Sequence, residues 1–305
     1  MFLAFSIEKT SEEYEMYKDL FGKTRQKVGL HIHTSLSDGD ATPEEVYSMY
    51  KAAGYDAIAL TDHRIYAEAG EVDGLTLISG AEYDTGQADT CCGVYHVLSL
   101  FAKRDPEIDC ASDGVQTMID KIHAAEGLAV LAHPAWSLNP PSDIMQYNGF
   151  DATEIYNAVS GVVQSFRPDS SLIVDMLAGM GREYPLLATD DAHYFEGRDN
   201  CVAYIMAECD NADSESIKNA IISRRFYATQ GPEIHFVKDG DVFKVYTSPV
   251  SHIYIASNAA WSRRTLHGEN ITYMEYRPRP FEKYLRAFAI DSDGKTAWSN
   301  IISLL

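Results

Sequence analysis

The sequence contains few basic residues for its length. Lys and Arg together number 25 against 45 Asp and Glu, which gives the 305-residue chain a formal charge of −20 at pH 7. Because binding to nucleic-acid phosphates depends on the available Lys and Arg, we do not expect nucleic acid as a tight, non-specific partner. Bound metal ions can still reverse the sign of the charge locally at an active site.

The sequence also lacks the patterns of disulfide frameworks, membrane spans and export signals. Its five cysteines are an odd number at no framework spacing, which is typical of reduced thiols. The longest apolar runs, such as residues 128–132, are far shorter than the roughly 18 to 20 residues of a membrane-spanning helix. The first residues carry no basic region ahead of an apolar stretch. We therefore expect a cytoplasmic protein with no membrane partner, and the sequence leaves its oligomeric state open.

The composition is that of a globular protein with a substantial core, because 46% of the residues are hydrophobic and 23% are charged. From residue 28 to about residue 227, short apolar runs that end in polar residues alternate with helical segments. This pattern indicates repeated βα units around a parallel sheet. The predicted strands are 28–33, 56–60, 75–79, 95–101, 128–132, 152–156, 185–188 and 202–207, and the predicted helices are 43–53, 114–126, 170–179 and 215–225.

Local signals divide the chain into three predicted parts. The run from Thr42 to Glu45 supplies an N-cap, a proline at the first helical position and a capping-box glutamate. A similar signal at residues 10–13 predicts a helix over residues 11–22. After residue 232, turn signals separate segments of alternating polarity. The predicted parts are an N-terminal helical extension (1–27), an α/β barrel domain (28–229) and a small β-rich, sandwich-like domain (230–305).

Histidines and carboxylates follow the ends of the predicted strands. His31 and His33 end the first strand, and because they lie two apart they project to the same side and can hold one ion. His96 would point into the same space if its side chain faces the barrel interior. In a closed parallel barrel the carboxyl ends of the strands converge on one face. The other residues at strand ends are Asp62, His63, Glu82, His133, Asp191 and His193.

Neutral imidazoles and carboxylates together are the ligands of Zn²⁺, Mn²⁺ and Fe²⁺. Three carboxylates (Asp38, Glu82 and Asp191) would oppose two or three divalent cations, which leaves the cluster with net positive charge. Such a cluster attracts an anion, so we expect a small phosphorylated substrate.

Three further residues are candidates for supporting roles. Arg64 directly follows His63, and Arg198 lies shortly after His193, so both could clamp a phosphate. For Arg198 a surface ion pair is an equally good alternative. Asp62 is predicted to orient a ligand imidazole, and the alternative is a simple turn residue.

The motifs in their order along the chain resemble those of the PHP family, the polymerase and histidinol phosphatase superfamily of metal-dependent phosphoesterases. The resemblance implies a distorted (β/α)7 TIM-like barrel with a two- or three-metal centre, and the segments 225–232 and 294–300 resemble members with a small C-terminal β-rich domain. The Ser37-Asp38-Gly39 version of the first motif lacks the histidine of some histidinol phosphatases, which disfavours histidinol phosphate as substrate. The matching runs are Gly29–Gly39, Ala59–His63, Gly80–Glu82, His96, Ala132–Pro134 and Thr189–His193.

The resemblance also implies a role for each ligand. His31, His33, Glu82 and Asp191 would hold a first metal, and Glu82 would bridge to a second. His96 and His133 would complete the second site. The third site would consist of Asp38, His63 and His193.

The predicted function is hydrolysis of a phosphate ester by a metal-bridging hydroxide, held at ions bound by Glu82 and Asp191. Two alternatives stay open at this point. A metal-dependent amide or carbamate hydrolase would use the same centre on a carbonyl carbon. A non-catalytic, metal-stabilised binding module would keep the ions without turnover.

Overall fold

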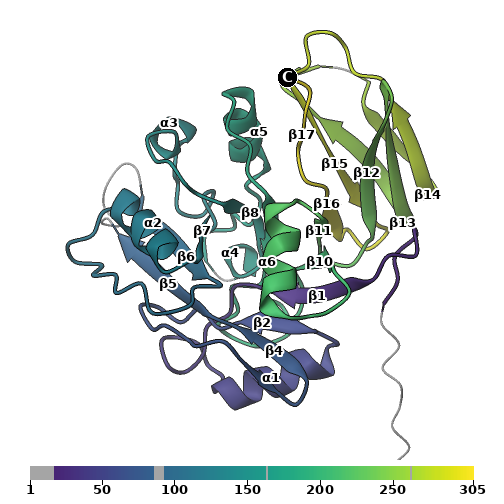
Figure 1. Cartoon of the computed structure of the whole chain (residues 1–305). Helices are drawn as coiled ribbons and strands as arrows, with labels where there is room; N and C mark the ends of the chain where they lie inside the picture. The colour runs from purple at the N-terminus through teal and green to yellow at the C-terminus, as the bar shows by residue number, and fades with distance from the viewer. Residues whose placement is uncertain (1–16, 86–92, 163, 262) are drawn as a thin grey trace, which may run out of the picture.

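The computed structural model describes residues 17–85, 93–162, 164–261 and 263–305 (Figure 1). Helices and strands are interspersed up to residue 222, and the part of the chain after this residue contains strands without helices among its described residues (Figure 1). The helices are α1 (Pro43–Ala52), α2 (Val115–Ala124), α3 (Pro141–Ile144), α4 (Val159–Val162), α5 (Ser171–Gly179) and α6 (Ser214–Ile222). The strands are β1 (Arg25–Gly29), β2 (Ala57–Ala59), β3 (Gly70–Val72), β4 (Leu75–Ile78), β5 (Gly80–Thr85), β6 (Tyr95–Leu100), β7 (Leu128–Leu131), β8 (Ala152–Asn157), β9 (Leu186–Thr189), β10 (Tyr204–Glu208), β11 (Phe226–Thr229), β12 (Ile234–Asp239), β13 (Val242–Ala256), β14 (Thr265–Tyr276), β15 (Tyr284–Ile290), β16 (Thr296–Trp298) and β17 (Ile302–Ser303).

Helix α1 forms for the reason that its sequence indicates. The Thr42 side chain accepts a hydrogen bond from Glu45 N, and the Glu45 carboxylate accepts one from Thr42 N at 2.8 Å, which is a complete capping box. Val46 and Tyr50 are buried on one face, so the helix packs an apolar stripe against the sheet.

The described strands form two sheets. One is a 12-stranded sheet with the order β12-β13-β15-β16-β11-β10-β1-β2-β4-β3, with β14 paired to β13 and β17 to β15. The other is a 5-stranded sheet with the order β5-β6-β7-β8-β9. Neighbours are parallel in β1–β2–β4 and in β7–β8–β9, which fits the predicted βα units. This is a mixed α/β fold, and the closure of the strands into a seven-unit barrel stays a prediction.

Strand β6 departs from the predicted parallel pattern. It runs antiparallel to both β5 and β7. His96 therefore lies near the start of its strand, yet it reaches the end of the sheet where β5 and β7 finish. Because β6 runs in the opposite direction to its neighbours, His96 at the start of β6 lies beside residues at the ends of the neighbouring strands.

Backbone hydrogen bonds connect the two sheets next to the predicted ligands. His33 N donates to Ala192 O at 3.0 Å, and Asp191 N donates to His31 O at 2.8 Å. On the other side, Arg64 N donates to Glu82 O at 2.7 Å. The segments that follow β1, β2 and β9 are therefore held against one another where they leave the sheets.

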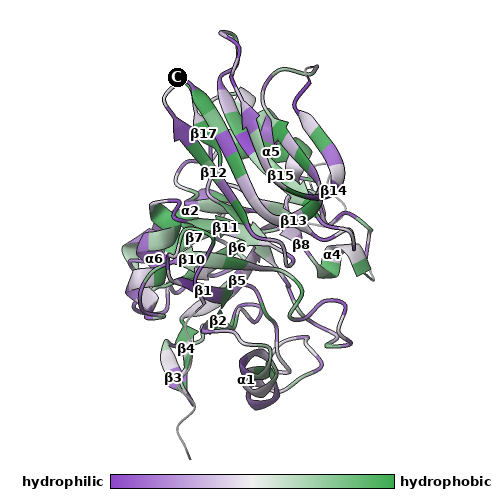
Figure 2. Ribbon diagram, turned by 90° about the vertical axis from the view of Figure 1, so that its right-hand side faces the viewer, coloured by the Kyte–Doolittle hydropathy of each residue, from purple (hydrophilic) through white to green (hydrophobic). Residues whose placement is uncertain are grey.

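The C-terminal strands continue the large sheet. Strand β16 pairs with β11, so that Trp298 lies opposite Ala228. The C-terminal strands carry both hydrophobic and hydrophilic residues (Figure 2), and along β13 buried residues mostly alternate with more exposed ones, as expected for a strand that buries one face. The β-rich character of this part is as predicted, while the proposed domain boundaries stay predictions.

Some element predictions need correction. Residues 1–16 of the N-terminal extension lie outside the described residues, and residues 17–22 are not helical. Arg25 N donates to Tyr17 O and the Asp19 side chain accepts from Phe21 N and Lys23 N, so this segment forms a turn beside β1. Glu82, which was predicted to follow the strand at 75–79, lies inside β5, a strand that was not predicted from the sequence. No helix of the described residues is long and apolar enough to cross a membrane.

Candidate metal centre

The nine predicted ligands come together at one end of the strands. His31, His33 and Asp38 follow β1, and His63 follows β2. Glu82 lies in β5 and His96 in β6, while the remaining residues leave the ends of β7 and β9. These remaining residues are His133, Asp191 and His193.

The tightest group consists of four buried residues whose ligand atoms lie within 4.8 Å of one another, namely His31, His33, Glu82 and Asp191. Asp191 Oδ1 lies 3.1 Å from Nε2 of His31 and 3.1 Å from Nε2 of His33. Nε2 of His33 also lies 3.2 Å from Glu82 Oε2. These are the four residues that the family resemblance assigned to the first metal.

Two further groups share residues with the first. His33, Asp38, His63 and His193 bring their ligand atoms within the same 4.8 Å limit, and so do His63, Glu82 and His96. His133 lies just outside these groups, with Nε2 at 3.2 Å from Glu82 Oε1. The assignment by resemblance put His133 rather than His63 beside Glu82 and His96, and the structure places both imidazoles close to Glu82.

Gly39 lets the loop after β1 return Asp38 to this cluster. A Cβ on Gly39 would lie 2.7 Å from His33 O, closer than such contacts allow. Asp38 Oδ1 consequently lies 3.4 Å from His33 Nδ1 and 3.5 Å from His193 Nε2. The glycine of the first motif is thus required by close backbone approach.

The electrostatics of the cluster fit the binding of cations. Within the described residues, every ion-pair partner of Glu82 and Asp191 is a histidine. Burial alone would raise the pKa of Glu82, but the surrounding imidazoles, His96 first, hold it well below its usual range. Burial likewise disfavours charged His31, but the nearby carboxylates, Asp191 first, raise its pKa to about 10. Buried carboxylates without Lys or Arg partners are compensated either by protonated histidines or by metal ions.

One buried atom marks the place for an ion most directly. Asp191 Oδ1 is buried and receives no hydrogen bond from the described residues, although two imidazole nitrogens lie 3.1 Å away. An unsatisfied buried carboxylate oxygen costs free energy unless a cation neutralises it. The donor set of imidazoles and carboxylates is also the one that Zn²⁺, Mn²⁺ and Fe²⁺ prefer. The residues present therefore fit divalent metal ions.

The backbone is strained at two of the cluster's positions. Asp191 has φ 52° and His133 has φ 24°, a region that side-chain-bearing residues rarely adopt. Such conformations persist where the surrounding structure holds them, and they concentrate at functional sites.

The residues that support the ligands were not predicted from the sequence. Glu154 accepts a hydrogen bond from His31 Nδ1 at 2.7 Å, and Ser137 Oγ lies 3.0 Å from His133 Nδ1. Asn157 Nδ2 donates to Asp191 Oδ2 at 3.0 Å. A signal existed for Glu154, because it is a charged residue in the middle of an otherwise apolar predicted strand.

Asp62 supports the loop after β1 rather than a ring directly. Its carboxylate accepts hydrogen bonds from Thr34 N, Thr34 Oγ1 and Ser37 Oγ at 2.7 to 2.8 Å. Ser37 Oγ in turn lies 3.4 Å from His33 Nδ1. Asp62 thus acts on the imidazole of His33 through one intervening side chain.

The two candidate phosphate clamps differ in position. Arg64 leaves the chain directly after His63 with φ 60° and forms a two-point ion pair with Asp84. Arg198 is 61% exposed and pairs with Glu196, its neighbour two residues earlier. The structure therefore shows for Arg198 the surface ion pair that the sequence left as an alternative.

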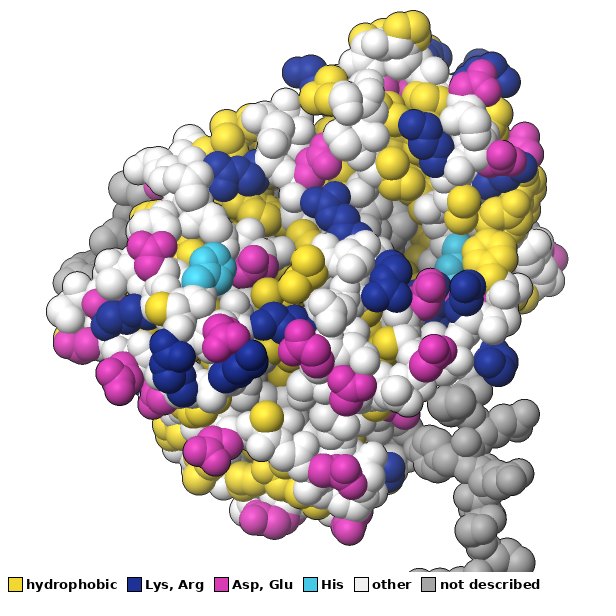
Figure 3. Space-filling view, in the orientation of Figure 1, with side chains coloured by type: hydrophobic (Ala, Val, Ile, Leu, Met, Phe, Trp, Pro, Cys, Tyr) yellow, Lys and Arg dark blue, Asp and Glu magenta, His cyan; other side chains and the backbone are white. Residues whose placement is uncertain are grey.

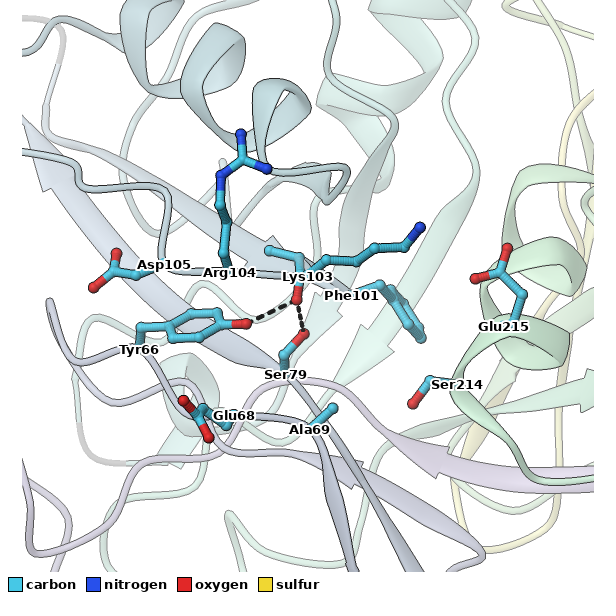
Figure 4. A pocket seen from close by; sticks show the side chains of 11 residues that line it. Tyr66, Glu68, Ala69, Ser79, Phe101, Lys103, Arg104, Asp105, Ser214 and Glu215 are labelled. Carbon is cyan, nitrogen blue, oxygen red and sulfur yellow. Dashed lines mark hydrogen bonds between the residues drawn. The ribbon is translucent and has the colours of Figure 1, made fainter.

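A separate cavity of about 830 Å³ contains none of the nine ligands (Figure 4). Tyr66 OH and Ser79 Oγ both donate to Ala102 O at its floor (Figure 4). It opens beside Phe101, after the end of β6 that is opposite to His96. This cavity is distinct from the metal centre.

A fourth buried group is formed by Asp19, Glu233 and His235. Its positively charged partner is an arginine of the chain itself. Arg25 Nε donates to Asp19 Oδ2 at 2.7 Å, and Tyr17 OH donates to Glu233 Oε2 at 2.6 Å. Because Arg25 compensates Asp19, and Tyr17 and His235 contact Glu233, the group is a structural contact between the N-terminal turn and β12.

The fold and the cluster define a mixed α/β protein with a candidate metal centre. Residues 29–158 match the family model of the PHP domain. Over these residues the match confirms the resemblance drawn from the motifs. No curated protein matches the sequence at a significant level.

Two solved structures are similar to the chain. One is a two-domain protein from Bacteroides vulgatus that contains a predicted PHP-like metal-dependent phosphoesterase, with 15% identity and a TM-score of 0.54 over 95% of this chain and 98% of that one. The other is an amidohydrolase from Chromobacterium violaceum, with 15% identity and a TM-score of 0.42 over 56% of this chain and 89% of that one. The first shows that the fold extends over both the PHP region and the C-terminal strands.

Proposed function

We propose that the protein is a metal-dependent phosphoesterase that binds two or three divalent ions, Zn²⁺, Mn²⁺ or Fe²⁺, and hydrolyses a small phosphorylated substrate. The observation that carries the proposal is the convergence of six histidines and three carboxylates in one cluster, in which the buried Asp191 Oδ1 receives no hydrogen bond from the described residues. The PHP domain at residues 29–158 and the predicted PHP-like phosphoesterase in the B. vulgatus structure support the same class.

The side chains divide the work of binding. Glu82 and Asp191 would both hold the ions, since each lies within 3.5 Å of Nε2 of His31 and Nε2 of His33. Divalent ions bound there would supply Lewis acidity, which lowers the pKa of water and neutralises charge on phosphoryl oxygens. His193 donates from Nδ1 to Asp191 O at 2.7 Å, which leaves its Nε2 lone pair towards Asp38.

Arg64 would orient the substrate at the edge of the centre. Its backbone N–H donates a hydrogen bond to Glu82 O, so the side chain of Arg64 leaves the backbone next to β5, the strand that carries Glu82. Asp84 fixes the guanidinium plane by accepting at 2.8 Å from Nε and at 2.7 Å from Nη2. A planar guanidinium held in this way is suited to a phosphate oxygen.

The proposal also fits the charge of the molecule. Acidic and basic side chains are interspersed on the face shown in Figure 3 and do not gather into one basic patch there. The attraction for an anionic substrate would therefore come from the ions and from Arg64 rather than from the general surface.

The test combines elemental analysis with hydrolysis of an aryl phosphate, with and without added Mn²⁺. Two to three ions per chain together with release of phosphate are expected. Bound metal with hydrolysis of an amide or carbamate and none of the phosphate ester would overturn the phosphoesterase proposal in favour of the carbonyl-hydrolysing alternative. Bound metal without turnover of either substrate type would favour the binding module.

A further inference from the structure

Glu154 is a fully buried carboxylate beside the metal centre that accepts four hydrogen bonds. Oε1 accepts from His31 Nδ1 and from Thr189 Oγ1, each at 2.7 Å. Oε2 accepts from His133 N at 2.8 Å and from Asn157 Nδ2 at 2.9 Å. The four donors come from the segments of β1, β7, β8 and β9, so this one carboxylate connects strands that are far apart in the sequence.

A bulge in β8 brings two of its side chains to the same face. Residues three apart in a regular strand point to opposite faces. Between β8 and β9, however, Glu154 pairs with Leu187 and Tyr156 pairs with Ala188, so β8 contains one extra residue. The extra residue allows Glu154 and Asn157 both to face the metal centre, where they bond to each other.

Building on the proposed function, we propose that Glu154 is the positioning residue of the metal centre. Its first action is on His31. Because the carboxylate accepts from Nδ1, the proton of His31 is held on that nitrogen and the Nε2 lone pair is left towards Asp191 Oδ1. A carboxylate acceptor also makes the imidazole a more basic ligand.

Its second action is on the spacing of the ligands that follow β7 and β9. The bond from His133 N fixes the backbone at a residue with φ 24°. Asn157 donates to Glu154 with Nδ2 and also to Asp191 Oδ2 at 3.0 Å, so the amide transmits the position of the carboxylate to the ligand after β9. Glu154 therefore sets the mutual position of His31, His133 and Asp191.

Glu154 is not itself a ligand in this arrangement. Each of its oxygens already accepts two hydrogen bonds, which occupies the four acceptor positions of an ionised carboxylate. Asp191 differs in this respect, because none of the described residues donates to its Oδ1. The contrast separates a carboxylate that orients ligands from one that is available to an ion.

The test compares metal binding by Glu154→Gln with that of the intact chain. The amide has the same size, but its NH₂ group would face two donors, either His31 and Thr189 or His133 and Asn157. We expect the dissociation constants for Zn²⁺ and Mn²⁺, measured by competition with a chelator, to rise by about 10- to 100-fold. The visible absorption of the Co²⁺-loaded chain should change as well, because the geometry around His31 is altered.

Glu282→Gln is the matched control. Glu282 is also a buried carboxylate with four donors, Ser257 Oγ, Arg264 Nη1, Tyr276 OH and Arg279 N, but it lies in the connection between β14 and β15. Its replacement should lower stability without changing the dissociation constants or the Co²⁺ spectrum. An equal loss of metal affinity in both variants would mean a general effect of stability and would overturn the positioning role.

The remaining outcomes are also decisive. Unchanged affinity in Glu154→Gln, with the intact chain binding metal, would overturn the role of Glu154 and leave the proposed function standing. No metal in the intact chain would instead overturn the proposed function. If Glu154→Gln does not fold, Asn157→Ala decides, because removal of the link to Asp191 should weaken binding by roughly 10-fold. If Asn157→Ala binds metal as tightly as the intact chain does, the positioning network is overturned.

Discussion

Arg64 and Asp84 form a two-point ion pair beside the metal centre, with Nε 2.8 Å from Oδ1 and Nη2 2.7 Å from Oδ2. The pair orients the positively charged guanidinium of Arg64 next to His63 and Glu82, although the Arg64 side chain is 60% exposed. Asp84, which holds Arg64, belongs to the same region of the chain. Removal of the arginine therefore tests substrate binding with little effect on folding.

Arg64→Ala should raise KM for a phosphate ester by about 10- to 100-fold and change kcat less, because a charge-assisted phosphate contact contributes about 1.5 to 3 kcal/mol. An exposed pair of this kind contributes about 0 to 1 kcal/mol to stability. Steady-state kinetics and urea unfolding measure both effects. Arg277→Ala, which removes an exposed arginine paired with Asp241 in the C-terminal strands, is the control. Equal kinetics in the two variants would argue against the phosphate clamp.

Asp191→Asn keeps the shape of the side chain and removes its negative charge. We expect phosphate release to fall by at least about 100-fold, because the transition-state charge loses its fixed electrostatic environment. Elemental analysis should show fewer ions per chain. Asp151→Asn, at a partly exposed aspartate that accepts from His123 and Ala129 N, should retain metal and turnover. Full activity in Asp191→Asn would contradict the assignment of this residue.

Removal of metal should destabilise the chain. Ions at a concentration 100 times the dissociation constant add about 2.7 kcal/mol to the free energy of unfolding. A chelator should therefore lower Tm by roughly 5 °C, measured by scanning calorimetry. The same treatment of Asp191→Asn should give a smaller decrease. Identical melting curves with and without chelator would mean that the cluster does not bind ions in the folded chain.

Asp175→Ala should destabilise the contact between α5 and the C-terminal strands. Asp175 accepts from Nε and Nη2 of Arg286 at 2.8 Å each, and Arg286 is almost fully buried. Without its partner the arginine would be a buried charge, so we expect a loss of about 3 kcal/mol in urea unfolding. Thr42→Ala, which removes the N-cap of α1, should cost only about 1 kcal/mol. A loss no larger than that of Thr42→Ala would show that the ion pair contributes little.

We expect the folded protein to lose stability in acid through protonation of Glu233. Burial alone would raise the pKa of Glu233, but hydrogen bonds, that of His235 first, hold it below its usual value. A carboxyl group with a lowered pKa in the folded state contributes stability above its unfolded pKa of about 4.3, and that contribution is lost as the pH falls through the folded value. Glu233→Gln should therefore reduce the decline of the unfolding free energy below about pH 4.5, measured by urea unfolding from pH 7 to pH 3. The exposed Glu71→Gln is the control, and parallel declines in the two variants would contradict the prediction.

The sequence by itself determined the candidate ligands and the local helix start. Seven of the nine metal-binding candidates follow from residue type and from their position at predicted strand ends, Asp38 and His96 complete the set in the family resemblance, and all nine meet in the structure. The capping box of α1 was also predictable, because its hydrogen bonds join residues only three apart. Interactions of this kind depend on local spacing, which is printed in the sequence.

Only the tertiary structure decided how distant segments meet. The antiparallel course of β6, the pairing of β16 with β11 and the bulge in β8 depend on which strands become neighbours, and periodicity does not encode this. The same holds for Glu154, whose donors His31 and Thr189 lie 123 and 35 residues away. A buried glutamate is visible in the sequence, but its partners are chosen by the packing of the sheets, and so is its role.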